Sequence, residues 1–191
     1  WDRCNMYIKS IELSNFRNYE YLSMEFHPEK NILYGDNAQG KTNILEALYY
    51  CGMMKSHKGS KEKEIIKLNE KEAHIRMLIE KKGVTRKIDM HLKRSKPKGV
   101  AIDGIPIRRS SELIGLVNIV FFSPEDLGII KHGPSGRRRF LDMELCQLDR
   151  VYYHDLAKYN KVMEQRNNLL KQITYDQSLL PTLDIWDEQL V

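Results

Sequence analysis

Residues 35–42 read Gly35-Asp36-Asn37-Ala38-Gln39-Gly40-Lys41-Thr42 and match the phosphate-binding pattern G-x-x-x-x-G-K-[ST] in full. The glycines let the backbone turn tightly, so that successive amide N–H groups converge on phosphate where a helix begins. Lys41 is expected to reach the β and γ phosphates, and the Thr42 hydroxyl to bind the Mg²⁺ that bridges them. The pattern therefore predicts a nucleoside-triphosphate site, made by the loop and the next residue: Gly35, Asp36, Asn37, Ala38, Gln39, Gly40, Lys41, Thr42 and Asn43.

The residues on either side of this loop agree with that prediction. Residues 31–34 (Asn-Ile-Leu-Tyr) are a short apolar run typical of a strand. From Lys41 onward, Ile44, Leu45 and Leu48 are spaced to bury one face of a helix. A strand, a glycine loop and a helix, in this order, form the setting in which the pattern binds phosphate.

The rest of the first part of the chain predicts further strands. Alternating apolar and polar residues favour two strands at 7–14 and 19–26 with a turn at 15–18, and two more around 75–79 and 88–92 with a turn at Lys82-Gly83. Asp103-Gly104 is a strong hairpin signal. Because Pro106 lacks a backbone donor, its strand is expected at a sheet edge. Residues 117–122 form a nearly continuous apolar run, typical of a strand covered on both faces.

The chain after residue 122 is predicted to be helical. Ser123-Pro124-Glu125-Asp126 has the residue types that begin a helix. Further helices are expected from Pro134, from about Arg150 to Lys171, and after a capping Thr182. We therefore predict an α/β domain over residues 6–122, with the P-loop and antiparallel strands, and a helical domain over 123–191. Met6 is the expected natural start, and the native chain is expected to continue beyond Val191.

Hydrolysis of the nucleotide needs a second feature, a hydrophobic strand that ends in an acid. Residues 117–122 are the candidate strand, but Glu125 and Asp126 lie beyond the predicted helix start. Asp142 lies within a predicted helix. We therefore expect no water-activating acid, and no catalytic residue, in this chain.

The charge of the chain is unevenly distributed. Of its 191 residues, 31 are Lys or Arg and 26 are Asp or Glu, which gives a net charge of +5. Residues 55–109 hold 17 of the basic residues and 7 of the acidic ones. This asymmetry suggests a basic face for nucleic acid, but on charge alone a solvated lysine-rich surface is the favoured explanation. No apolar stretch is long enough for a membrane span, and three scattered cysteines fit free thiols in a reducing cytoplasm.

Two groups of basic residues are candidates for contact with DNA phosphates. The first lies on neighbouring predicted strands and turns and comprises Lys81, Lys82, Arg86, Lys87, Lys93, Arg94, Lys96 and Lys98. The second is the run Arg137, Arg138 and Arg139, of which at most two share one helix face. The alternative for the run is that one arginine pairs with an acid such as Glu144.

Several segments resemble the RecF family of bacterial DNA-repair ATPases and the wider SMC-like ATPases. Residues 7–19 are similar to the opening strand and turn of these proteins, and Gly35 to Glu46 to their Walker A segment. The stretches that resemble RecF itself are Ser56-His57-Lys58, Phe122 to Leu127, Gly133 to Asp142, and Trp186 to Leu190.

The resemblance implies an ABC-type ATPase head that binds ATP and Mg²⁺ and closes as an ATP-sandwiched homodimer on DNA. RecF proteins act at single-strand gaps and at junctions of single- and double-stranded DNA. They work with RecR and RecO to help load RecA, in replication and the SOS response. In such a head, residues 6–122 form lobe I and residues 123–191 begin lobe II. Arg17 and Asn18 are then expected near the phosphates, and Ser56-His57 near the nucleoside.

The sequence departs from the family at three points. No stretch resembles the signature motif or Walker B, so the weak DNA-dependent hydrolysis of an intact protein is not expected of this chain. Phe122-Ser123 stands where related heads carry a glutamine, so no glutamine is assigned to Mg²⁺. Because ABC heads pair central strands from both ends of the chain, we leave open whether the P-loop is ordered.

Two other functions remain as alternatives. A P-loop kinase or small-molecule phosphotransferase would need a catalytic acid and a lid, and no arginine-lined lid is recognisable here. A pure interaction module with a vestigial P-loop would have no reason to keep the Gly-Lys-Thr triplet at residues 40–42. Turnover of ATP with a small acceptor, independent of DNA, would favour the phosphotransferase.

Overall fold

The computed structural model describes residues 6–57, 60–124 and 133–190. The chain forms two compact units, Trp1–Phe122 and Ser123–Val191. The first contains a sheet with helices, and the second contains helices alone in its described part. The assignment of residues 6–122 and 123–191 to the two lobes of an ATPase head stays a prediction.

The first unit is built on a six-stranded antiparallel sheet with the order β2-β1-β3-β4-β5-β6. Four of the five neighbouring pairs are consecutive in the chain and are joined by short connections, which is why these pairs are antiparallel. The strands are β1 (Met6–Phe16), β2 (Tyr19–Glu25), β3 (Glu72–Lys81), β4 (Val84–Lys93), β5 (Gly99–Ile102) and β6 (Ile105–Pro106).

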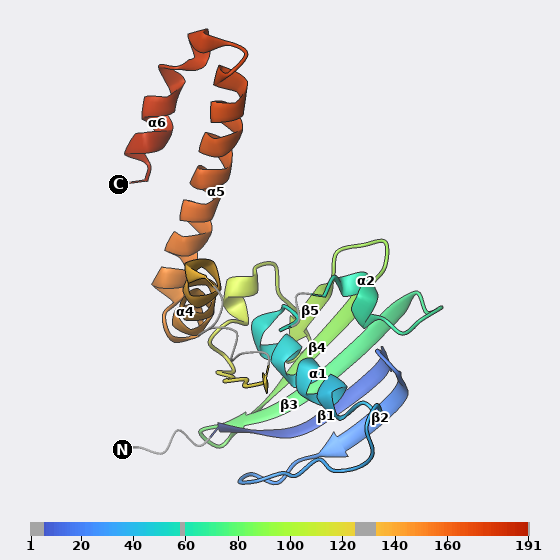
Figure 1. The fold of residues 1–191 in the computed structure, drawn as a ribbon. Coiled ribbons are helices and arrows are strands. Elements are labelled where there is room, and N and C mark those ends of the chain that lie inside the picture. The colour runs from blue at the N-terminus through green and yellow to red at the C-terminus, as the bar shows by residue number, and fades with distance from the viewer. Residues whose placement is uncertain (1–5, 58–59, 125–132, 191) are drawn as a thin grey trace. The chain divides into compact units, whose positions relative to one another are not determined.

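One face of this sheet is covered by α1 (Lys41–Met53), as Figure 1 shows. The smaller helices α2 (Glu62–Ile65) and η1 (Ser110–Glu112) belong to the same unit. Side chains at every second strand position point toward α1 and are fully buried, which is the period of a strand with one covered face. The main contributors to this core are Ile11, Leu13, Ile75, Met77, Ile79, Ile88, Met90 and Leu92, with Ala47, Tyr50 and Cys51 from α1.

The turn chemistry predicted from the sequence is confirmed. Lys82 and Gly83 join β3 to β4 with φ values of 54° and 77°. Asp103 and Gly104 join β5 to β6 with φ values of 53° and 83°. Two consecutive positive φ values are the mark of a type I′ hairpin turn. Pro106 lies on β6, the outermost strand, as its missing donor requires.

The strand predicted at residues 31–34 is wrong. These residues form no strand, and Ile32 and Tyr34 are 84% and 91% exposed. A strand needs a backbone partner, and within the described residues no strand pairs with this run. In the following helix, Leu45 is exposed while Ile44, Ala47 and Tyr50 form the buried stripe, so the helix is rotated slightly from the predicted orientation.

The strand predicted at residues 117–122 is also wrong. Val117 makes an isolated bridge with Ile114, and the residues that follow it are irregular. Ile119 packs toward Gly52 of α1, whereas Val120 and Phe122 are exposed. The apolar run therefore packs through single side chains against the helix, and it is not covered on both faces.

The second unit contains α4 (Pro134–Leu148), α5 (Arg150–Ile173), η3 (Gln177–Leu179) and α6 (Thr182–Glu188). Pro134 is in the first turn of α4, and Asp149 caps α5 by accepting from the Val151 amide at 2.8 Å. Both agree with the predicted helix starts, whereas Thr182 is the first helical residue of α6 and not its cap. Of the helix predicted from Ser123, residues 125–132 lie outside the described residues.

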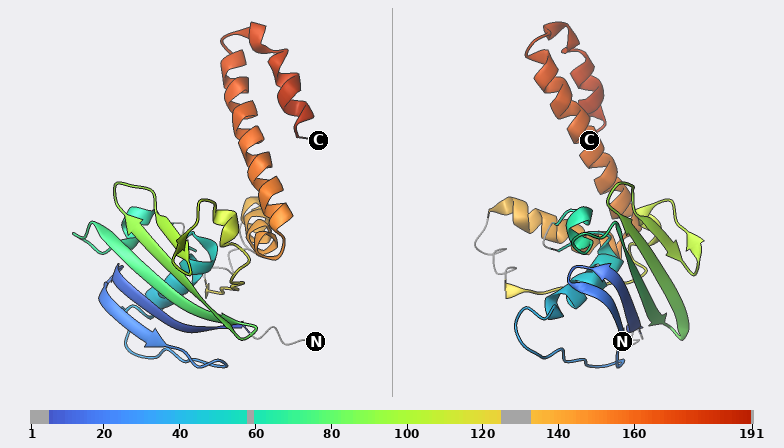
Figure 2. Two further views of the ribbon diagram at one scale, coloured as in Figure 1. Left: turned by 180° about the vertical axis from the view of Figure 1, so that it is seen from behind. Right: turned by 90° about the vertical axis from the view of Figure 1, so that its right-hand side faces the viewer.

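Within this unit α6 runs back alongside α5, as both views in Figure 2 show. An ion pair joins Arg166 of α5 to Asp187 of α6, with Nε and Oδ1 separated by 2.5 Å. Across the described part of the chain, no helix combines the length and the apolar character that a membrane span needs.

Candidate nucleotide-binding site

The glycine loop runs from Gly35 to the N-terminus of α1, where Gly40 is the residue before the helix. Gly40 has a φ of 97°, in the region that favours glycine. A Cβ atom added to Gly40 would lie 2.7 Å from both Asn18 Nδ2 and Tyr19 Oη. Glycine is therefore required at this position twice over, by its backbone conformation and by the close approach of the β1–β2 turn.

Lys41 and Thr42 begin α1 where the sequence pattern predicts. Lys41 Nζ donates to the carbonyl oxygens of Gly35 at 2.7 Å and Asp36 at 2.5 Å. These two bonds close the loop over the start of the helix. Thr42 is exposed in the first turn. The amides of Asn43 and Ile44 donate to the Gly40 carbonyl at 2.8 and 3.2 Å, so the amides that can face a phosphate are those of Lys41 and Thr42. The first turn therefore presents N–H donors, an ammonium and a hydroxyl, the set that a Mg²⁺-bound triphosphate requires.

Asn18 holds the loop from the side. Its Oδ1 accepts from Asn43 Nδ2 at 2.7 Å, and its Nδ2 donates to Gln39 O at 3.4 Å. The Tyr19 hydroxyl donates to the same Gln39 carbonyl at 3.3 Å, and burial raises the pKa of Tyr19. The structure thus brings Asn18 and Asn43 together at the P-loop. Tyr19 was missed, although its position next to Asn18 at the start of a strand was a usable signal.

Arg17 points away from the loop, toward the body of α1. Its Nε and Nη2 donate to the carboxylate of Glu46 at 2.9 and 2.7 Å. It also donates to Ser60 Oγ and to the Glu64 carbonyl, both at 2.8 Å. Protein acceptors therefore engage this guanidinium, and its contact with bound phosphates stays a prediction.

Glu46 is the residue of this network that the sequence reasoning missed. Its side chain is fully buried and also accepts from Ser56 Oγ at 2.6 Å. Burial on its own would raise the pKa of Glu46, but the hydrogen bonds from Arg17 and Ser56 and the charge of Arg17 outweigh it and hold the pKa below the ordinary value. An acid between the buried positions Ile44 and Ala47 was the available signal, because a buried carboxylate needs a cationic partner.

His57 lies in an aromatic cluster with Tyr49 and Phe121. The ring centroids of His57 and Phe121 are 4.2 Å apart, and those of His57 and Tyr49 are 5.9 Å apart with the rings edge-on. Tyr49 is two turns along α1 from Lys41, or about 12 Å at the helical rise. The predicted contact of His57 with the nucleoside stays a prediction.

Four of the eight basic residues proposed from the sheet region are held by acceptors of the protein itself at 3.1 Å or less. Lys81 donates to the Leu116 carbonyl at 3.0 Å, and Arg86 pairs with Asp103 at 2.7 Å. Arg94 donates to the carbonyls of Glu70 and Lys67 at 2.6 and 3.1 Å, and Lys98 pairs with Glu62 at 2.6 Å.

The other four do not gather in one place. Lys82 is in the β3–β4 turn, whereas Lys93 and Lys96 are at the opposite end of β4, a strand of 10 residues and so about 33 Å long. Lys87 lies between these ends, with Nζ 3.5 Å from Asp89. On α4, Arg137, Arg138 and Arg139 are all exposed, and no ion pair joins them to Glu144 in the described part of the chain.

Comparisons with known proteins identify the family of the chain. The sequence profile of the AAA ATPase domain family matches residues 6–181. Over 186 residues the chain is 69% identical to the DNA replication and repair protein RecF of Lachnoclostridium phytofermentans, covering 97% of this chain and 52% of that protein. The chain spans about half the length of the curated relatives it matches.

Two solved structures extend the likeness to the fold. A RecF–ATP structure, of the recombination mediator protein in the RecFOR pathway, has a TM-score of 0.93 at 39% identity, covering 98% of this chain and 50% of that one. The Smc head domain of Pyrococcus furiosus has a TM-score of 0.57 at 17% identity, covering 97% of this chain and 54% of that one, which is a likeness of fold alone. The predicted α/β fold of a P-loop ATPase head is confirmed.

Proposed function

The chain belongs to the AAA ATPase domain family, among its RecF members, and from this premise we propose that it is the ATP-binding part of an ATP-dependent DNA repair protein. The observation that carries the proposal is the arrangement around Lys41. The lysine lies on a complete phosphate loop that Asn18 and Tyr19 hold in place from the neighbouring turn.

The loop residues would bind the triphosphate through three kinds of donor. An ammonium has three N–H bonds, and Lys41 uses two of them on the carbonyls of Gly35 and Asp36, which leaves one for a phosphate oxygen. The amides of Lys41 and Thr42 at the start of α1 would bind further phosphate oxygens, helped by the helix dipole. The Thr42 hydroxyl would hold Mg²⁺, which supplies positive charge that neutralises the phosphates.

DNA is the proposed macromolecular partner. By likeness to the relatives, the whole protein would act at single-strand gaps and at junctions of single- and double-stranded DNA, in the cytoplasm. It would work with RecR and RecO to help load RecA, in replication, recombinational repair and the SOS response. Support comes from the identity with RecF and from the RecFOR pathway in which the solved RecF–ATP structure is placed.

Hydrolysis and dimer formation are proposals for the whole protein, because this chain spans about half of its relatives. A weak, DNA-dependent ATPase that closes as an ATP-sandwiched homodimer is the activity proposed. No residue of this chain is assigned to the hydrolytic step. The contribution proposed for the chain is to hold the triphosphate and Mg²⁺ through Lys41, Thr42 and the loop amides.

The test is an equilibrium titration of Mg²⁺-ATP into this chain, into Lys41→Met and into the control Lys82→Met, whose lysine lies in the β3–β4 turn. We expect the chain and the control to bind alike and Lys41→Met to bind at least about tenfold more weakly, the usual loss for a hydrogen bond to a charged group. Equal binding by Lys41→Met would show that the loop is not the site.

If none of the three binds, the same set is remade in a chain of full RecF length. Absence of binding there removes the proposal. Turnover of ATP with a small-molecule acceptor and without DNA would support a phosphotransferase instead.

A further inference from the structure

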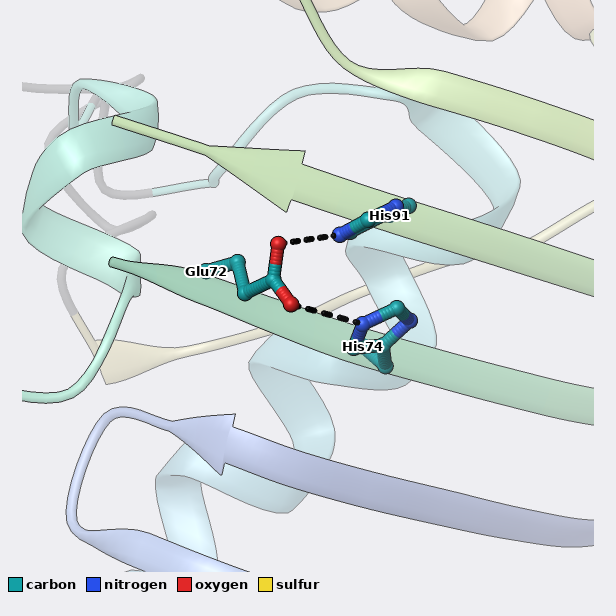
Figure 3. Close-up of side chains that lie close together, drawn as sticks. All are labelled: Glu72, His74 and His91. Carbon is teal, nitrogen blue, oxygen red and sulfur yellow. Dashed lines mark hydrogen bonds and ion pairs between the residues drawn. The ribbon is translucent and has the colours of Figure 1, made fainter. Parts of the chain in front are cut away.

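A second polar cluster lies on the face of the sheet that α1 does not cover. Glu72 and His74 are on β3, and His91 is on β4 directly opposite His74 in the register. Because the neighbouring Ala73, Ile75, Met90 and Leu92 point into the core, these three side chains point to the other face. Figure 3 shows both imidazole rings turned toward the Glu72 carboxylate.

We propose that Glu72, His74 and His91 form a surface site for a divalent transition-metal ion of the zinc class. One carboxylate oxygen and two imidazole nitrogens would be the ligands. This site is separate from the P-loop and takes a different kind of ion, because the nucleotide's Mg²⁺ prefers oxygen ligands and rarely binds imidazole.

The distances in the cluster come close to those of a bound ion. His91 Nε2 is 2.9 Å from Glu72 Oε2, and His74 Nε2 is 3.9 Å from Glu72 Oε1. One ligand atom from each residue lies within 4.8 Å of the others. Zinc bonds of about 2.0–2.2 Å place ligand atoms roughly 3.3 Å apart at the edge of a tetrahedron. The ligand atoms of the cluster therefore need to approach one another by up to about 1.5 Å to hold an ion.

The side chains are free to make that adjustment. Glu72 and His74 are 49% and 52% exposed, so their rotamers are not fixed by packing. The two rings are stacked, with centroids 3.9 Å apart and planes at 25°, so they must rotate apart before their in-plane nitrogens can share one ion. The backbone pairing of β3 with β4 fixes the Cα positions of both histidines, so only side-chain torsions need to change when an ion binds.

Three protein ligands leave one tetrahedral position open. A cavity of about 380 Å³ borders both histidines, with Arg76 and Asp89 also in its wall. Two histidines and one carboxylate with an open position form a ligand set that zinc uses in proteins. The ion would bridge adjacent strands and stabilise their pairing.

One nearby cation opposes the ion. Lys93 is the register partner of Glu72 on β4, so its ammonium lies on the same face of the sheet. Its long side chain can move away into solvent, but its positive charge still acts on Glu72. Removal of this charge should strengthen metal binding, whereas removal of any of the three ligands should weaken it.

The test is a calorimetric titration of Zn²⁺ into the tag-free chain, His74→Ala, His91→Ala and the control His154→Ala, whose histidine is exposed on α5. We expect one Zn²⁺ per chain in the wild type and the control. Each site variant should bind Zn²⁺ at least about tenfold more weakly. Loss of a residue that only hydrogen-bonds to a metal ligand already lowers metal affinity by about that factor. Binding that is unchanged in both site variants, or absent from the wild type, would overturn the site.

A second measurement separates loss of the ligand from loss of the fold. Circular dichroism without metal should be the same for all variants, because exposed residues contribute little to stability. Zn²⁺ should raise the Tm of the wild type but not of His91→Ala. Mg²⁺ at the same concentration should leave both unchanged.

Two charge variants complete the test. Glu72→Gln keeps the size of the side chain and should also weaken Zn²⁺ binding about tenfold. Lys93→Gln should tighten it by about threefold, because one positive charge beside a dication is removed. If a histidine variant does not fold, the Zn²⁺ affinity of Glu72→Gln is the deciding measurement. An unchanged affinity in that variant would overturn the proposed site.

Discussion

The guanidinium of Arg17 and the carboxylate of Glu46 form a bidentate ion pair that joins the β1–β2 turn to the middle of α1. Glu46 is fully buried and Arg17 is 19% exposed. Ser56 and Ser60 add hydrogen bonds to the two partners. Since α1 begins at the phosphate loop, this pair fixes the helix that carries the site.

Glu46→Gln should destabilise the first unit strongly. The change keeps the size of the side chain but leaves the Arg17 guanidinium without its counter-charge, which for a buried pair costs about 3 kcal/mol. Urea unfolding followed by circular dichroism measures the loss. Glu20→Gln is the matched control, because Glu20 pairs with Lys67 while 86% exposed, and it should change stability by less than about 0.5 kcal/mol.

The same pair should make the protein sensitive to acid. The pKa of Glu46 is lower in the folded chain than its ordinary value of 4.5, so its stabilising contribution is present above that pH and is lost as the pH falls through the folded value. The stability difference between wild type and Glu46→Gln should therefore be largest near neutral pH and shrink below pH 4.5. A difference that stays constant from neutral to acid pH would contradict the assigned role of Glu46.

Gly40→Ala should disturb the nucleotide site more than an equivalent change elsewhere. Alanine at a φ of 97° is strained, and its Cβ would also meet Asn18 and Tyr19 at 2.7 Å. We expect a loss of stability of about 2–3 kcal/mol, together with loss of Mg²⁺-ATP binding.

Gly83→Ala is the control for this change. Gly83 has a φ of 77° with no atom close to the added Cβ, so strain alone should cost about 1 kcal/mol. Binding of Mg²⁺-ATP should be unaffected in this variant. An equal effect of the two substitutions on binding would contradict the close packing of Asn18 and Tyr19 on the loop.

Lys98→Met and Lys96→Met should have different effects. Lys98 Nζ is held by Glu62 at 2.6 Å and by the Met54 carbonyl at 2.7 Å, so its loss should cost about 1–3 kcal/mol of stability. Lys96 is exposed, so its loss should leave stability unchanged. If Lys96 contacts a DNA phosphate, Lys96→Met makes the slope of the logarithm of the DNA-binding constant against the logarithm of salt concentration shallower by about one. Unfolding curves and DNA titrations at two salt concentrations check both outcomes.

Local chemistry was enough to predict the hairpins and the helix of the P-loop. Lys82-Gly83 and Asp103-Gly104 need positive φ values, and the sequence shows which residues tolerate them. The conformation of residues 35–42 could also be predicted from the sequence, because two glycines and the start of a helix define the phosphate loop.

Tertiary partners explain what the sequence could not predict. The apolar runs at 31–34 and 117–122 resemble strands, but an apolar run does not specify which backbone groups pair with it. Likewise, Arg17 and Asn18 are neighbours in one turn and looked equivalent. Their different directions depend on Glu46, on Gln39 and on Asn43, which are close in space but distant in sequence.

The two-residue turn at Arg17 and Asn18 has a consequence for insertions and deletions. One residue reaches α1 and the next reaches the glycine loop, so an added or deleted residue would misdirect both side chains at once. Surface turns usually tolerate changes in length, and the Lys82-Gly83 turn, with open space around Gly83, is expected to do so. A peptide tag or a fluorophore should therefore be tolerated between β3 and β4 but not between β1 and β2.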